Sequence, residues 1–164
     1  MVKQLFLPLA AVAIFIVLVG VFIKNPSRFG LQITPVVSTP SSLKEIKVAD
    51  HSLKVSVADT NQERTKGLSG VTSLSENEGL LFIFDKENTI PSFWMKDMLI
   101  GIDIIWINDG KIVQIDKNLL PPEKGTLDSS LKLYKPSNGV DQVLEVNSGF
   151  SDKNNIKVGD NVSL

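Results

Sequence analysis

The 164-residue chain contains no cysteine and a single histidine, His51. The lack of cysteine excludes a lipid-modified lipoprotein and a Cys/His catalytic pair. One histidine without cysteine also disfavours a zinc or copper site, because such sites draw on several of these ligands. A glycine-rich phosphate loop and a nucleophile elbow are missing as well. Without these motifs, the sequence does not identify an enzymatic reaction.

The chain also lacks a cluster of basic residues. It has 17 Lys and Arg against 18 Asp and Glu, and three of the basic residues, Lys3, Lys24 and Arg28, precede residue 43. Residues 43–164 therefore carry 14 basic and 18 acidic side chains, a net charge of −4. Neutralising nucleic-acid phosphates requires a basic patch. We therefore expect no nucleic-acid partner.

One long apolar run is present near the amino terminus. Residues 5–23 are nineteen uncharged residues between Lys3 and Lys24. As a helix they would span roughly 28 Å, which matches the hydrocarbon core of a bilayer. A cleaved signal peptide is the alternative, but its apolar region is usually shorter and ends at a small-x-small site that this run lacks. We predict an uncleaved transmembrane anchor over residues 1–24.

The anchor sets an expectation for location. Its short amino-terminal tail and the large domain after it favour a single-pass cell-membrane protein whose carboxy-terminal domain is extracytoplasmic. Residues 25–42 include Pro26, Pro35 and Pro40 and show no periodicity, which is typical of an extended linker. Residues 43–164 have the length of one domain.

Within this domain the pattern is mostly that of short strands. Residues 45–48 and 53–58 alternate apolar and polar side chains around a turn, and residues 79–84 (GLLFIF) indicate a buried strand. Residues 60–63 form a T-x-x-E capping box ahead of Gly67, which predicts one short helix.

Further strands are predicted in the second half of the domain. Residues 100–107 and 111–116 are joined by Asp109-Gly110, a hairpin signal. Residues 140–146 and 158–164 suggest strands, with a helical turn at 148–155 between them. The expected fold class is α+β, mostly antiparallel β: a rolled or barrel-like sheet with one or two short helices, preceded by one transmembrane helix.

A two-residue hairpin loop fixes the register of the strands beside it. It pairs Asn108 with Lys111, and the predicted pairs are then 107 with 112, 106 with 113, 105 with 114, 104 with 115 and 103 with 116. Asp103 would face Asp116, and like charges directly opposite each other are destabilising. The register therefore predicts a cation between them, a proton on one of them, or strands that diverge first.

Several short motifs resemble one known family. They are R-x-x-G-L at 64–68, G-L-L-F at 79–82, F-W-M-K-D at 93–97, Asp103, L-E-V at 144–146 and V-G-D at 158–160. Together they are similar to the domain of unknown function 192 family, small bacterial and archaeal domains that are often exported or membrane-anchored. The resemblance covers about residues 53–164. It implies a compact β-rich fold and supplies no established activity.

The chain departs from the family pattern at three positions. Ser69 and Leu80 stand where the family usually has methionine, and Met98 stands where it usually has threonine. These departures argue against a required role for those three side chains.

Asp103 is the sharpest candidate for a functional residue, because it lies among isoleucines and tryptophans and an unpaired buried carboxylate is costly. It is either a structural group, paired with Lys96 or Arg64 or capping backbone amides, or a group that binds or reacts. Trp94, Lys96 and Asp97 precede it as an aromatic ring beside charged groups, which suits a sugar or a heterocycle. Phe93, Met95 and Trp106 are expected in the core.

Three more candidates complete the predicted ligand-binding set. Arg64 has the fork geometry for a buried carboxylate, with Asp103 or Glu145 as partner. Glu145 is either a barrel-interior ion pair or an exposed edge charge, and Asp116 follows from the hairpin register. No cofactor is predicted, and a hard cation held by Asp97, Asp103, Asp116 or Glu145 is a minor alternative.

The sequence favours binding of a small ligand or partner in a pocket around Trp94, Lys96, Asp97 and Asp103. Binding is preferred because no nucleophile with its own base can be identified. A hydrolase or transferase using two of the carboxylates is the first alternative. A non-catalytic protein-interaction module with an exposed apolar patch is the second.

Overall fold

The computed structural model describes residues 43–164, which is the region predicted as the globular domain. The predicted anchor at 5–23 and the linker at 25–42 lie outside the described residues. Within 43–164, no helix has the length and apolar character that a membrane span requires.

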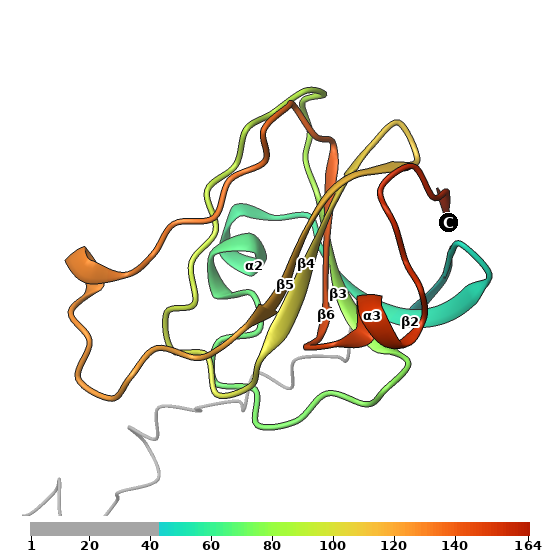
Figure 1. Cartoon of the computed structure of the whole chain (residues 1–164). Helices are drawn as coiled ribbons and strands as arrows, with labels where there is room; N and C mark the ends of the chain where they lie inside the picture. The colour runs from blue at the N-terminus through green and yellow to red at the C-terminus, as the bar shows by residue number, and fades with distance from the viewer. Residues whose placement is uncertain (1–42) are drawn as a thin grey trace, which may run out of the picture. The chain divides into compact units, whose positions relative to one another are not determined.

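Seven strands form one curved sheet in the order β5-β4-β6-β3-β2-β1-β7 (Figure 1). Neighbouring strands are antiparallel except β2 and β3, which are parallel. The sheet curls until Lys111 at the start of β5 forms a bridge with Asn161 beside β7. The result is a half-barrel, which confirms the mostly antiparallel α+β prediction. The strands are β1 Lys44–Val48, β2 His51–Ala58, β3 Glu78–Ile83, β4 Ile102–Asn108, β5 Lys111–Leu119, β6 Gln142–Asn147 and β7 Val162–Ser163.

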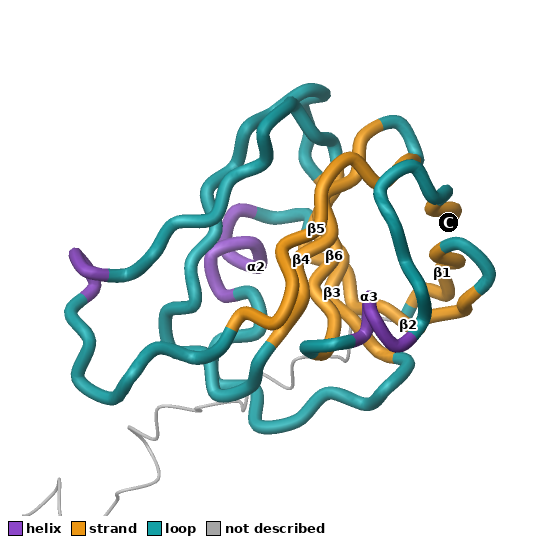
Figure 2. Tube along the Cα trace, viewed as in Figure 1, coloured by secondary structure: helices purple, strands orange, loops and turns teal. Residues whose placement is uncertain are grey.

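The short helices α2 (Asn61–Lys66) and α3 (Phe150–Lys153) lie on opposite sides of the sheet (Figures 1 and 2). The predicted capping box begins α2: the Thr60 hydroxyl accepts from the Glu63 N–H at 3.2 Å, and the Glu63 carboxylate accepts from the Thr60 N–H at 3.1 Å. Gly67 ends α2 with a φ of 50°. Since α2 joins the parallel strands β2 and β3, its position beside the sheet follows from the crossover. A 3-10 turn, η2, spans Asp128–Ser130.

Each face of the sheet carries its own hydrophobic core, because side chains alternate along the strands. One core includes Ile105, Leu81 and Phe150 of α3. The other includes Trp106 and Phe82, and it is covered by residues after α2 and by the segment 91–98. Asp103 belongs to the first face and Glu145 to the second, because Asp103 pairs with Val146 while Glu145 pairs with Ile104.

The β4–β5 hairpin begins as predicted. Asp109 and Gly110 have φ values of 50° and 66°, as a type I′ turn requires. Asn108 pairs with Lys111, and Ile107 pairs with Ile112. The two-residue loop is therefore confirmed.

Beyond Ile107 the predicted register is wrong. Trp106 pairs with Gln114 and Ile104 with Asp116, so Val113 is an extra residue on β5. Such a bulge moves every later residue to the other face. Asp103 consequently does not face Asp116, and the predicted repulsion between them does not arise. A second shift leaves Asp103 beside Asn118, which has a φ of 56°.

Candidate functional site

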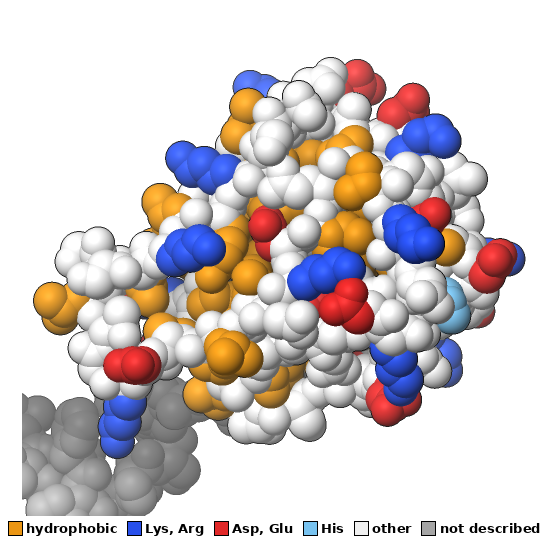
Figure 3. Space-filling view, in the orientation of Figure 1, with side chains coloured by type: hydrophobic (Ala, Val, Ile, Leu, Met, Phe, Trp, Pro, Cys, Tyr) orange, Lys and Arg blue, Asp and Glu red, His pale blue; other side chains and the backbone are white. Residues whose placement is uncertain are grey.

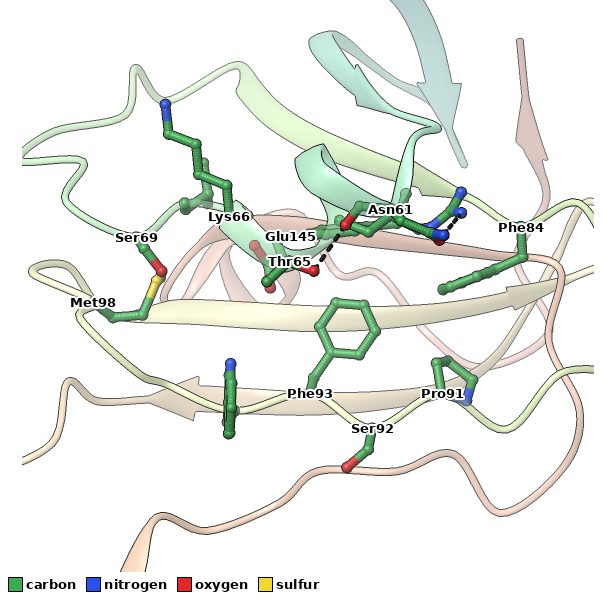
Figure 4. Close-up of a pocket in the computed structure, with 15 residues that line it drawn as sticks. Asn61, Thr65, Lys66, Ser69, Phe84, Pro91, Ser92, Phe93, Met98 and Glu145 are labelled. Atoms are coloured by element: carbon green, nitrogen blue, oxygen red, sulfur yellow. Dashed lines mark hydrogen bonds between the residues drawn. The ribbon is translucent and has the colours of Figure 1, made fainter. Parts of the chain in front are cut away.

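A cavity of about 340 Å³ lies between α2, the turn after it, and the segment 91–98 (Figure 4). Its floor is the sheet face that carries Glu145. The side chains that line it come from four parts of the chain, and four of them are aromatic. They are Asn61, Arg64, Thr65, Lys66, Leu68, Ser69, Phe82, Phe84, Pro91, Ser92, Phe93, Trp94, Met98 and Glu145, with the backbone of Gly67.

Gly67 leaves the space above Glu145 open. A Cβ at this position would lie 3.5 Å from a ring carbon of Phe82 and 4.0 Å from Oε2 of Glu145. The φ of 50° also favours glycine, since L side chains rarely adopt this conformation. The residue that ends α2 is thus part of the cavity as well.

Packed aromatic rings hold the cavity wall in place. Phe93 meets Phe82 edge to face, with centroids 4.9 Å apart and planes at 80°. On its other side Phe93 meets Trp106 at 5.4 Å and 85°. Edge-to-face pairs add stabilisation beyond the area they bury. In Figure 4 the Phe93 ring points from the segment 91–98 toward α2, so it faces the cavity from a fixed position.

Glu145 is the buried acidic group of this cavity. It lies on β6 between Leu144 and Val146 and is only 5% exposed. Its Oε2 atom is buried and has no hydrogen-bond partner. Burial raises the pKa of the carboxyl to about 8. Among residues 43–164 it takes part in no ion pair, so it is neither the interior ion pair nor the exposed charge that the sequence suggested.

Arg64 lines the same cavity but does not neutralise Glu145. Its Nη1 donates to the carbonyls of Asp59 at 2.5 Å and Ile83 at 2.7 Å, and its Nη2 donates to Oδ1 of Asn61 at 2.8 Å. Asp85 lies 3.8 Å from Nη2. The predicted pairing with Asp103 or Glu145 is therefore wrong. Arg64 instead ties α2 to the ends of β2 and β3.

Asp103 lies on the other face of the sheet, away from the cavity. Its side chain is fully buried and accepts hydrogen bonds from the N–H groups of Asn118 at 2.8 Å, Gly149 at 3.1 Å and Ser151 at 2.9 Å. Of the structural interpretations, the capping of backbone amides is confirmed, and pairing with Lys96 or Arg64 is not. The structure does not bring Asp103 together with Trp94.

Trp94 and Lys96 remain together as predicted, and Trp94 lines the cavity. Trp94 is 44% exposed, and the Lys96 ammonium lies 5.7 Å from its ring centroid. Lys96 also pairs with Asp128 of η2, which raises the pKa of the lysine. Lys96 and Asp97 do not line this cavity; they border a second hollow against residues 121–131.

Asp116 is a structural partner of Trp106. It accepts from the indole N–H at 2.7 Å and from the Gln114 amide at 3.2 Å. It does not line the cavity, where Glu145 is the one acidic side chain. The carboxylate pair required by a hydrolase is therefore not assembled there. Across residues 43–164, no three His, Cys, Asp or Glu side chains group as metal ligands would.

The interaction-module alternative requires a large exposed apolar patch, and the segment after β5 offers three exposed leucines. Leu120, Leu127 and Leu133 are more than half exposed on the segment after β5.

Comparison with known families identifies the domain. The family model DUF192, described as "Uncharacterized ACR", matches residues 44–164. The chain belongs to the DUF192 family. No curated protein matches it.

Solved structures similar to this DUF192 domain cover 74% of the chain. One is a protein of unknown function from Novosphingobium aromaticivorans, with 27% identity, a TM-score of 0.67 and 85% of its own chain covered. Another is a protein from Sinorhizobium meliloti 1021, suggested to be a transcription regulator, with 25% identity, a TM-score of 0.65 and 95% of its chain covered.

The sequence did not indicate several residues of the cavity. Thr65 and Phe84 stand only in a predicted helix and strand, whereas Gly67 and Phe82 belong to the R-x-x-G-L and G-L-L-F motifs that carry the family resemblance. Two of the three departures from the family pattern, Ser69 and Met98, line the cavity, and Leu80 does not. Glu145 was recognisable as a charge between two apolar residues, as Asp103 was.

Proposed function

We propose that this DUF192 domain binds a small, largely apolar molecule in the cavity between α2 and the segment 91–98, with Glu145 as the polar contact at its floor. The observation that carries the proposal is the buried, unpaired Oε2 of Glu145 in an aromatic-lined cavity. Buried polar groups are nearly always satisfied, so an exception inside a cavity points to a missing partner. The cavity volume of about 340 Å³ is at the lower end for ligand sites.

Binding is favoured over catalysis because the hydroxyls of Thr65 and Ser69 in the cavity lining are already engaged, and the Ser92 side chain points away from the cavity in Figure 4. Thr65 donates to the carbonyl of Asn61 at 2.8 Å, and Ser69 donates to the carbonyl of Lys96 at 2.9 Å. A nucleophile needs a base as its hydrogen-bond partner. Both hydroxyls act on backbone carbonyls instead.

We further propose that the domain is held at a membrane by residues 1–24 and faces the extracytoplasmic side. The support is the uncharged run at 5–23. The role in transcription suggested for the Sinorhizobium protein is not carried over to this chain. Binding of nucleic acid is not proposed, since residues 43–164 are net acidic and the face in Figure 3 interleaves blue and red side chains. The ligand is then a small molecule from outside the cytoplasm.

The binding proposal can be tested with benzyl alcohol as a neutral probe, followed by NMR on the full chain. We expect roughly millimolar affinity, as for a ligand of this size, with shifts of the Gly67 and Phe93 amides. Thr65→Trp should weaken binding at least tenfold, because residue 65 lines the cavity from an exposed helix position.

Gln62→Trp is the matched control. It places the same side chain on the same helix at an exposed residue that does not line the cavity. Equal binding by the two variants, or no shift at Gly67 and Phe93 with saturating probe, would contradict the proposal.

A further inference from the structure

We infer that the ligand class of the DUF192 cavity is a small organic cation, an alkyl- or arylammonium, which takes the place of the proton on Glu145. The inference rests on the proposed function and specifies the chemistry of the same site. Its basis is the combination of one unpaired carboxyl with aromatic rings at the floor of a cavity.

The floor offers a cation two kinds of contact. Oε2 of Glu145 has no hydrogen-bond partner in the protein and can accept from an ammonium group. Phe82, Phe93 and Trp94 line the same space. Aromatic faces attract ammonium groups, and the attraction is strongest where water is excluded. A bound cation would therefore donate a hydrogen bond to the carboxyl and would also be attracted by the aromatic rings.

No cationic side chain in the cavity lining pairs with Glu145 in place of a ligand. Arg64 and Lys66, both from α2, are the only further charged side chains in its lining, and β3 and the segment 91–98 contribute none. The Arg64 guanidinium is occupied by two carbonyls and by Asn61. Lys66 is exposed and extends away from the cavity in Figure 4. An anion at the floor would therefore find no free cationic side chain to pair with.

Proton exchange gives the inference a measurable signature. The pKa of Glu145 is about 8, so at neutral pH the empty cavity holds the carboxylic acid. A bound ammonium stabilises the carboxylate, and the carboxyl proton passes to the solvent. Below pH 8 each cation that binds therefore releases about one proton, and its affinity rises about tenfold per pH unit.

The test compares benzylamine with benzyl alcohol, which has nearly the same shape without the charge, on the full chain in detergent. Between pH 6 and 7.5 we expect benzylamine affinity to rise about tenfold per unit, while benzyl alcohol affinity changes less than threefold. Calorimetry in buffers of different ionisation enthalpy should detect about one proton released per benzylamine at pH 6.5.

Glu145→Gln is the variant that tests the cation class. It should lose the pH dependence and at least tenfold in benzylamine affinity at pH 7.5, because an amide cannot exchange a proton for the cation. Benzyl alcohol binding together with pH-independent benzylamine binding would overturn the cation class and leave the binding site standing. Binding of neither probe would overturn both.

Discussion

Two buried carboxyls on neighbouring strands have opposite surroundings. Asp103 accepts three backbone N–H groups, whereas Oε2 of Glu145 accepts none. A carboxyl that is desolvated without donors favours its proton, and the pKa of Glu145 is raised for this reason. Two carboxyl groups thus have different roles: one links backbone segments on one face of the sheet, and the other has an oxygen without a hydrogen-bond partner on the opposite face.

The raised pKa of Glu145 predicts how stability depends on pH. The folded state keeps this proton up to a pKa of about 8, while the unfolded chain releases it near 4.5. Between these values the folded state binds more protons, so the free energy of unfolding falls as pH rises. The fall attributable to Glu145 is at most about 1.4 kcal/mol per pH unit, and it ends above pH 8.

Urea denaturation of wild type and Glu145→Gln at pH 5, 6.5 and 8 measures this contribution. The variant should lack the decline and should be the more stable of the two at pH 8, by up to a few kcal/mol. Other carboxyls titrate equally in both proteins, so they cancel in the difference. A constant difference across the three pH values would show that Glu145 is not held protonated.

At the scale of elements, Asp103 joins three parts of the chain. It lies on β4 and binds the backbone of Asn118 in β5 and of Gly149 and Ser151 at the start of α3. In Asp103→Asn the side-chain NH₂ group would replace one of the accepting oxygens, so it would face at least one backbone N–H donor that it cannot bind. We expect a loss of about 2 to 4 kcal/mol in unfolding free energy, measured by urea denaturation.

Asp97→Asn is the control for that substitution, because Asp97 is exposed and should change stability by about 0.5 kcal/mol or less. If the two variants were equally stable, Asp103 would not have the joining role that its hydrogen bonds indicate.

The elements themselves were largely predictable, and their exact pairing was not. Alternation, the capping box at Thr60 and the Asp109-Gly110 turn depend on neighbouring residues, and the elements predicted within residues 43–164 are present, the last strand only as Val162–Ser163. The extra residue Val113 leaves no mark in the alternation, because a bulge depends on what packs against each face. The register error in turn gave Asp103 the wrong neighbour.

The candidate site could likewise be predicted only in part from neighbouring residues in the sequence. Sequence could identify both buried acids as unusual, but it could not tell which would find donors. The N–H groups that satisfy Asp103 belong to residues 15 to 48 positions away. The cavity likewise combines α2, the end of β3 and residues 91–98, which only the fold brings together.

At the scale of the whole molecule, the proposed anchor predicts a topology that the missing cysteines make easy to measure. A single cysteine at Lys124→Cys, an exposed position, should react with a membrane-impermeant maleimide on intact cells. Val2→Cys should react only after the cells are permeabilised. The protein should also stay in the membrane pellet after a carbonate wash.

The opposite labelling pattern would reverse the proposed orientation. Recovery of the full chain in the carbonate supernatant would contradict the anchor itself.

The irregular path of β5 has a consequence for how separate molecules behave. As an edge strand, β5 is a surface on which another chain could add a strand and begin aggregation. Its start is already bound to the segment before β7, through the Ile112 N–H and the carbonyl of Asp160 at 3.0 Å. Further along, Gln114 holds residues 135–137, and the bulges and the left-handed Asn118 interrupt the strand. The bulge at Val113, which made the predicted register wrong, therefore also makes the β5 edge a poor template for self-association.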